Sequence, residues 1–138
     1  MASDPKHSHH VEHERRYTKD HEWAREHAGL VRVGITAFAV HELGDITLVN
    51  LDVKPGDTLT AGKAFGTIES VKTLSDLFAP ISGKVVRVNA DLESKPELVN
   101  EDCWHQAWMI ELSPSDAGEL HALLDHQAYA HLLETAAH

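Results

Sequence analysis

The sequence lacks the features that mark disulfide-rich, membrane-spanning and nucleic-acid-binding proteins. Cys103 is its only cysteine, so the chain forms no internal disulfide, and a lone thiol is more often buried than catalytic. Its 12 lysines and arginines face 22 aspartates and glutamates, and the formal charge of −10 would repel the phosphates of a nucleic acid. No apolar run approaches the roughly 20 residues of a membrane span, and no signal peptide is evident. We therefore expect a cytoplasmic protein, or a mitochondrial matrix protein if this is a processed eukaryotic form, whose partners present a basic face.

Motifs of catalysis and metal binding are missing as well. The 12 histidines suggest no set of nucleophile, base and orienting group, and neither an HExxH nor a CxxC spacing occurs. We therefore predict neither enzymatic activity nor a metal site. Residues 1–16 hold four histidines among charged and small residues, which predicts a flexible arm, although such tracts can also bind metal. Residues 17–138 have the length of one globular domain.

Short apolar segments separated by turn residues fill most of this domain. Residues 31–35 alternate between apolar and polar or small side chains, which is the period of a half-buried strand. Residues 46–53 predict another strand, with a bulge where the alternation changes phase between Leu48 and Val49. Further strands are predicted over residues 84–89 and 108–112, and a turn over residues 54–57. The pattern indicates a small β-rich domain.

Two segments have the composition of helices. Residues 37–43 lie between Thr36, a suitable N-cap, and Gly44, a suitable residue just beyond a helix C-terminus. Near the end of the chain, Ser115 or Asp116 is placed to cap a helix, and apolar residues then recur at helical spacing. We expect both segments to pack against the sheet.

The most informative segment, residues 68–77, centres on a lysine. Val71 and Leu74 enclose Lys72, and a second apolar pair lies three residues further out on each side. Glycine followed by lysine occurs at similar distances in both directions, as expected for turns at the far ends of two strands. This arrangement fits a hairpin with Lys72 at its tip, where an enzyme can reach the amine.

A helix is the alternative for the same segment, because apolar residues every three positions also fit one helical face. Several β-branched residues favour strands, and Gly66 and Pro80 near the two ends disfavour a continuous helix. We therefore prefer the hairpin. A lysine on a surface turn is usually a solvated charge, so these patterns alone do not predict that Lys72 is modified.

From about Tyr17 to the C-terminus, the chain resembles the H proteins of the glycine cleavage system. The resemblance rests on motifs that occur in order: Tyr17-Thr18-Lys19-Asp20-His21-Glu22-Trp23, Val33-Gly34-Ile35-Thr36, Leu43-Gly44-Asp45-Ile46, Glu69-Ser70-Val71-Lys72, Ala79-Pro80-Ile81-Ser82-Gly83 and Pro96-Glu97-Leu98-Val99-Asn100. It implies a mainly β fold, a flattened barrel or sandwich hybrid of the biotinyl/lipoyl-carrier type, with flanking short helices and a C-terminal helical segment. Biotin carriers have methionines on both sides of the lysine, whereas this chain has Val71 and Thr73.

The resemblance further implies lipoate, attached covalently to Lys72. Glu69 and Gly83 match positions that the attaching enzyme, a lipoate ligase or a lipoyl/octanoyl transferase, recognises in the family. The remaining partners would be glycine decarboxylase (P protein), aminomethyltransferase (T protein) and dihydrolipoyl dehydrogenase (L protein). The chemistry would belong to those partners, and this chain would carry the aminomethyl group between them.

The family also folds its loaded arm against a cleft of the carrier, and four residues match positions of that cleft. They are Glu22, Ile35, Leu43 and Asp76. An ammonium-like head group favours a carboxylate, and an aliphatic arm favours apolar walls. Ordinary packing and surface charge are the alternative explanation for these residues.

Two other functions stay open at this point. One alternative is a lipoyl or octanoyl reservoir in a relay to 2-oxoacid dehydrogenases, with the same Lys72 modified. The other is an unmodified interaction domain, which a measurement of the intact mass would reveal.

Overall fold

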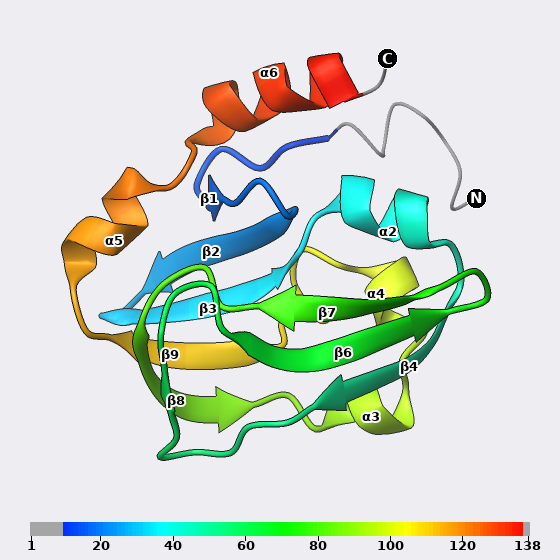
Figure 1. The fold of residues 1–138 in the computed structure, drawn as a ribbon, viewed down its shortest axis with the longest axis horizontal. Coiled ribbons are helices and arrows are strands. Elements are labelled where there is room, and N and C mark those ends of the chain that lie inside the picture. The colour runs from blue at the N-terminus through cyan, green and yellow to red at the C-terminus, as the bar shows by residue number, and fades with distance from the viewer. Residues whose placement is uncertain (1–9, 137–138) are drawn as a thin grey trace.

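The computed structural model describes residues 10–136, which form two antiparallel sheets with short helices around them (Figure 1). The larger sheet has the strand order β1-β2-β3-β9-β8-β5. Its strands are β1 (Arg16–Tyr17), β2 (Glu22–His27), β3 (Leu30–Ile35), β9 (Ile110–Pro114), β8 (Gly83–Val88) and β5 (Thr58–Leu59). The smaller sheet, in the order β4-β6-β7, consists of β4 (Ile46–Leu51), β6 (Ala64–Ser70) and β7 (Leu74–Phe78).

The main core lies between these two sheets. Val31 and Val33 face it from the larger sheet, and Val49, Ile68 and Leu77 face it from the smaller one. Each of these five side chains is at most 2% exposed, and burial of this kind contributes roughly 1.5–3 kcal/mol per large aliphatic residue. The result is a flattened sandwich and not a closed barrel, which confirms the mainly β fold with flanking helices.

The four predicted strands are present with small changes at their ends. The irregularity in β4 falls between Ile46 and Leu48, slightly before the predicted position, because Thr47 is the extra outward-facing residue. The sequence did not predict β2, whose second half is charged and exposed. It also did not predict β1 and β5, which have two residues each and depend on pairing with distant strands.

The first predicted helix is confirmed with its caps. Helix α2 (Ala37–Leu43) begins after Thr36, whose hydroxyl accepts a hydrogen bond from the Ala39 amide at 3.3 Å. It ends at Gly44, whose amide donates to the Val40 carbonyl at 2.9 Å and whose φ of +83° favours glycine.

The predicted C-terminal helical segment is present as two helices. Asp116 caps α5 (Ala117–Ala122), and Asp125 accepts from the Ala128 amide at 2.8 Å in the first turn of α6 (His126–Ala136). Two further helices, α3 (Asp91–Ser94) and α4 (Leu98–Glu101), are too short to leave a periodic signal. Within residues 10–136, no helix is both long and apolar enough to span a membrane.

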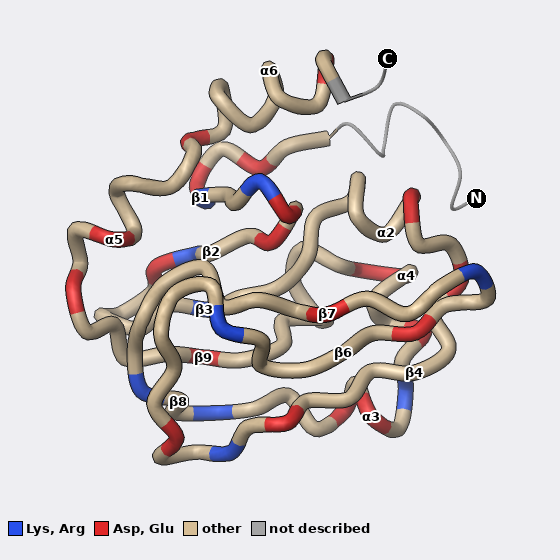
Figure 2. Tube along the Cα trace, in the orientation of Figure 1, with Lys and Arg blue, Asp and Glu red and all other residues tan. Residues whose placement is uncertain are grey.

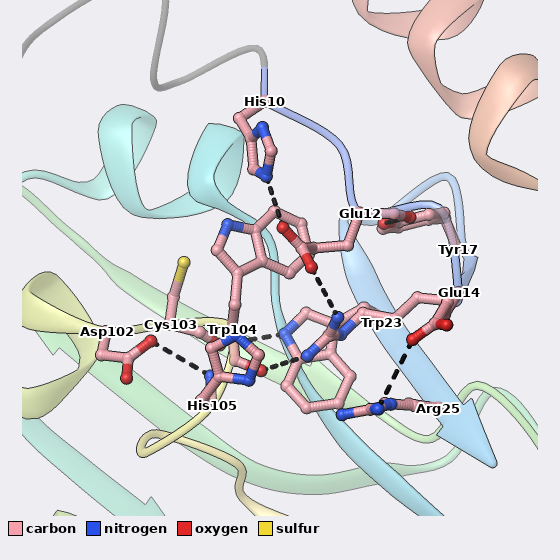
Figure 3. Close-up of polar contacts among 11 residues, drawn as sticks. His10, Glu12, Glu14, Tyr17, Trp23, Arg25, Asp102, Cys103, Trp104 and His105 are labelled. Carbon is pink, nitrogen blue, oxygen red and sulfur yellow. Dashed lines mark hydrogen bonds and ion pairs between the residues drawn. The ribbon is translucent and has the colours of Figure 1, made fainter.

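The segment just before β1 packs against the domain (Figure 3). Arg15 is 4% exposed, and its guanidinium lies 4.6 Å from the ring centre of Trp23 and 5.3 Å from that of Trp104. Arg15 also donates to the Trp104 carbonyl and pairs with Glu12 at 3.2 Å. Figure 3 shows Glu12, Trp23 and Trp104 close together at this contact. Residues 1–9 of the predicted arm lie outside the described residues. From His10, whose ring centre lies 5.8 Å from that of Trp104, the chain contacts the domain, and the charged sequence of this segment did not indicate this packing.

A second, smaller core cluster packs α6 against the segment around β1. Tyr129 of α6 stacks on Tyr17 with ring centres 4.4 Å apart. Its hydroxyl forms hydrogen bonds with the Thr36 hydroxyl at 2.7 Å and with His21 Nδ1 at 2.8 Å. Because Thr36 caps α2, helix α6 fixes the N-terminal end of that helix.

Candidate functional site

Lys72 lies at the tip of the β6–β7 hairpin, which confirms the hairpin and excludes the helix. The Ser70 amide donates to the Thr73 carbonyl at 2.8 Å and closes the turn. The Ser70 hydroxyl accepts from the amides of Lys72 at 3.1 Å and Thr73 at 3.2 Å. Serine two residues before Lys72 is therefore a turn signal of the kind that serine hydroxyls provide, and the sequence reasoning did not use it.

The side chain of Lys72 is exposed and lies along the C-terminal end of α2. Its Nζ donates to the Glu42 carbonyl at 3.4 Å, where the negative end of the helix dipole favours a cation. A Cβ on Gly44 would lie 3.2 Å from Lys72 Cε, so glycine leaves room for the side chain there. Figure 2 shows the blue hairpin tip among red segments of α2, β6 and β7. The amine is thus accessible and sits in acidic surroundings.

A loop and a short helix hold the hairpin tip in place. The Val71 amide donates to the Asp45 carbonyl at 3.0 Å. Asn100 of α4 fixes both sides of that loop residue: its Nδ2 donates to the Gly44 carbonyl at 3.0 Å, and its Oδ1 accepts from the Ile46 amide at 2.9 Å. Asn100 is more than 50 residues away from this loop in the chain, so local patterns did not identify it as a supporting residue.

The two residues expected to guide lipoylation differ in their surroundings. Glu69 is exposed on β6, three residues before Lys72, where a partner can reach its carboxylate. Gly83 is buried at the start of β8, and a Cβ there would lie 2.5 Å from the Ser113 carbonyl oxygen and 3.2 Å from Pro114 Cα. Close packing of β8 on β9 therefore requires glycine at position 83 whether or not an enzyme recognises it.

Gly83→Ala is expected to lower the free energy of unfolding by about 1–3 kcal/mol, the usual cost of overpacking against rigid backbone. Urea denaturation of the mutant and the parent protein measures this. Gly118→Ala is a matched control, because the nearest atom there is the end of the flexible Asp116 side chain at 3.1 Å. Unchanged stability in Gly83→Ala, together with loss of lipoylation, would contradict the packing explanation.

The structure brings only some of the four cleft candidates together. Glu22 and Ile35 are opposite each other in the β2–β3 ladder, and each is 3% exposed. The Glu22 carboxylate accepts from the Thr18 hydroxyl at 2.7 Å and from the Phe78 amide at 3.3 Å. Asp76 is close to Phe78 in the chain but exposed, and Leu43 is half-buried against the main core.

Burial shifts the pKa of the Glu22 carboxyl group. Removal of the carboxylate from water raises the pKa of Glu22 from 4.5 to about 7, although its hydrogen bonds with Thr18 and Phe78 act in the opposite direction. Burial therefore makes the neutral form of the Glu22 carboxyl group, next to the end of β7, more favourable than it is for an exposed glutamate.

Cys103 is buried, as expected for a lone thiol. It is 8% exposed, and burial raises the pKa of Cys103 to about 12. The thiol is therefore protonated at neutral pH and is a poor nucleophile.

Comparisons with known proteins agree with this geometry. A family model described as "Glycine cleavage H-protein" matches residues 15–136. The chain is 51% identical over 119 residues to a glycine cleavage system H protein of Magnetococcus marinus, covering 86% of this chain and 84% of the relative. It is 50% identical over 121 residues to one of Bacillus licheniformis, covering 88% and 94%. A crystal structure of a glycine cleavage system H protein from Mycobacterium marinum superposes with a TM-score of 0.81 at 38% identity, covering 90% of this chain and 99% of the other.

Proposed function

The chain belongs to the family of glycine cleavage H proteins, which carry lipoate in the glycine cleavage system, and we propose that Lys72 is the residue to which lipoate is attached. The observation that carries this proposal is the exposed Lys72 amine at the tip of a hairpin, held away from the core by Ser70. An amine in that place can be modified, and an arm attached to it can move without displacing the domain.

The residues around Lys72 fit the attached group. After acylation, Lys72 Nζ keeps one N–H. The Glu42 carbonyl, which accepts from Nζ in the unmodified protein, is placed to accept from this N–H as well. Gly44 leaves space beside the Lys72 side chain, and Asn100 keeps the supporting loop fixed. Lipoate supplies, when bound, a disulfide that accepts the one-carbon unit and electrons.

The proposed role is that of a carrier without catalytic residues. Glycine decarboxylase, aminomethyltransferase and dihydrolipoyl dehydrogenase would act on the arm in turn, after a lipoate ligase or a lipoyl/octanoyl transferase has attached it. Tethering raises the effective concentration of the arm at each active site, so the chain contributes positioning. The cytoplasm stays our prediction for where this occurs.

We propose a second role for the pair Glu22 and Ile35, which are opposite each other at the start of β2 and the end of β3, where the Glu22 carboxylate accepts from the Phe78 amide at the end of β7. A loaded arm with an amine at its end would be received there by the Glu22 carboxylate, with Leu43 as an apolar wall and Asp76 at the outer rim. Glu22 has the buried position and the hydrogen-bonded carboxylate that such a site needs.

The protein incubated with a lipoate ligase, ATP and lipoate is expected to gain one lipoyl mass, measured by intact mass spectrometry. The lipoylated form should then support glycine-dependent bicarbonate exchange by a cognate glycine decarboxylase. An unchanged mass would contradict the attachment. Full lipoylation without exchange would instead favour the lipoyl reservoir for 2-oxoacid dehydrogenases.

A further inference from the structure

The large apolar side chains that this fold leaves exposed gather in one place. Among residues 10–136 they are Leu48, Val71 and Leu74, which are 43%, 68% and 60% exposed. Single exposed leucines are ordinary on a protein surface. These three belong to the hairpin with Lys72 at its tip and to the strand beside it. The exposure of three large apolar side chains in one small region therefore needs an explanation.

Strand register places two of these residues in one row with an acidic residue between them. Glu69 of β6 is opposite Leu48 of β4 on one side and opposite Leu74 of β7 on the other. Directly opposed residues point to the same face of a sheet. Val49 and Ile68, the next residues inward on β4 and β6, are buried. Leu48, Glu69 and Leu74, here called the outer row, therefore point away from the core.

The outer row has acidic neighbours. Asp76 is exposed one row further along β7, opposite Thr67, and points to the same face as the row. Glu42 and Asp45 are exposed where α2 leads into β4, and their backbone carbonyls accept from Lys72 Nζ and from the Val71 amide at the hairpin tip. A partner that binds here needs apolar groups on both sides of a basic one, within a positively charged surface.

The reaction at Lys72 indicates which partner this is. Acylation forms a bond between Lys72 Nζ and the carbonyl carbon of an activated lipoyl donor, an acyl adenylate or a thioester. The bond from that carbon to the adenylate oxygen or to sulfur breaks, and the amine releases a proton. The catalytic centre must therefore reach an atom that lies 3.4 Å from the Glu42 carbonyl, so the enzyme has to contact the hairpin itself. Enzymes that act on the far end of the arm do not have to reach Lys72 Nζ.

We propose that the outer row, together with Val71, is the docking surface for the enzyme that acylates Lys72. That enzyme would place a basic side chain against Glu69 and apolar side chains against Leu48 and Leu74. The inference rests on the proposed lipoylation of Lys72 and extends it from one acidic residue to a surface that spans three strands.

Steady-state lipoylation of the purified unmodified protein by a lipoate ligase tests this surface. In the double variant Leu48→Asn/Leu74→Asn, we expect the KM for the carrier to rise about tenfold or more, because the apolar contacts are lost, while kcat changes less than about twofold. The double variant Leu48→Met/Leu74→Met keeps apolar contacts and should retain the parent KM. Thr58→Asn, at an exposed position of β5 in the other sheet, controls for position.

Charge gives a second readout that does not depend on apolar packing. Added salt should lower kcat/KM for the parent protein, because it screens the attraction between Glu69 and the ligase. Glu69→Gln should show a weaker salt dependence. If the double variant folds poorly, the two single substitutions and this salt readout decide the question.

The possible failures are distinguishable. A parent protein that gains no lipoyl mass would contradict the proposed function. A parent protein that is lipoylated, with the asparagine double variant acylated at the same KM, would overturn the docking surface alone. The prelipoylated double variant should also keep the parent KM with dihydrolipoyl dehydrogenase. A higher KM for the double variant with dihydrolipoyl dehydrogenase would assign the outer row to a different partner and overturn the proposal. A KM that rises only in bicarbonate exchange with the decarboxylase would do the same.

Discussion

Lys72→Arg is expected to abolish lipoyl attachment and to reduce glycine-dependent bicarbonate exchange to the level of a reaction without carrier. An amide forms on a neutral amine, whereas a guanidinium with a pKa above about 12 stays protonated. Arginine keeps the positive charge, and it can still donate to the Glu42 carbonyl, which accepts from Lys72 in the parent protein. The hairpin held by Ser70 should therefore keep its conformation, so the loss reports on the amine and not on the fold.

Intact mass after incubation with lipoate ligase measures the first effect, and exchange with a cognate decarboxylase measures the second. Lys63→Arg and Lys84→Arg are matched controls, because both lysines are exposed and lie near turns of the same domain. Each control should gain one lipoyl mass and support exchange as the parent does. A lipoyl mass on Lys72→Arg would show that another lysine is the attachment site.

Glu22→Gln is expected to remove a large pH dependence from the stability of the protein. Burial raises the pKa of Glu22 from 4.5 to about 7, so between these values the folded protein holds a proton that the unfolded chain releases. The stabilisation is fully present below about pH 4.5 and is lost as the pH rises through about 7. At 1.36 kcal/mol per pKa unit, the difference amounts to about 3 kcal/mol.

Urea denaturation of parent and variant at several pH values between about 4 and about 8 measures this prediction. The free energy of unfolding of the parent, minus that of Glu22→Gln, should fall by about 3 kcal/mol over this range. His21, whose pKa is lowered by burial, titrates in both proteins and cancels in the difference. Glu26→Gln, on the exposed half of β2, controls for the removal of one carboxylate from the same strand. A constant difference for Glu22→Gln would be incompatible with a raised Glu22 pKa.

Much of the fold could be predicted because its signals are local. Thr36 and Gly44 mark the two ends of α2 by the hydrogen bond of a cap and a positive φ, which depend on neighbours within four residues. Alternation identified β3 because one of its faces is buried along the whole strand. Strand β2 was not predicted, because its buried residues are concentrated in its first half and the sequence shows no regular alternation there.

The candidate site could be predicted only in part, for the same reason. The apolar residues around Lys72 indicated a hairpin, and the family motifs indicated lipoate. Asn100 lies in one of those motifs, but its supporting role could not be predicted, since its hydrogen bonds reach a loop that is distant in the chain. The outer row could not be found either, because Leu48 and Leu74 become neighbours of Glu69 only through pairing across three strands.

By itself, then, the sequence determined that this is a small acidic β-rich domain with Lys72 on a turn, because composition, turn residues and capping residues act over a few positions, while the carrier role was implied only by the family motifs. Only the tertiary structure decided where the Lys72 amine rests, why Gly83 must be glycine, that Arg15 is buried between Trp23 and Trp104, and that Glu22 titrates near neutral pH. Each of these depends on residues far apart in the chain meeting in space. Burial, close contacts and electrostatic surroundings depend on which distant residues come together in the folded protein, and the pattern of residues along the chain does not show this.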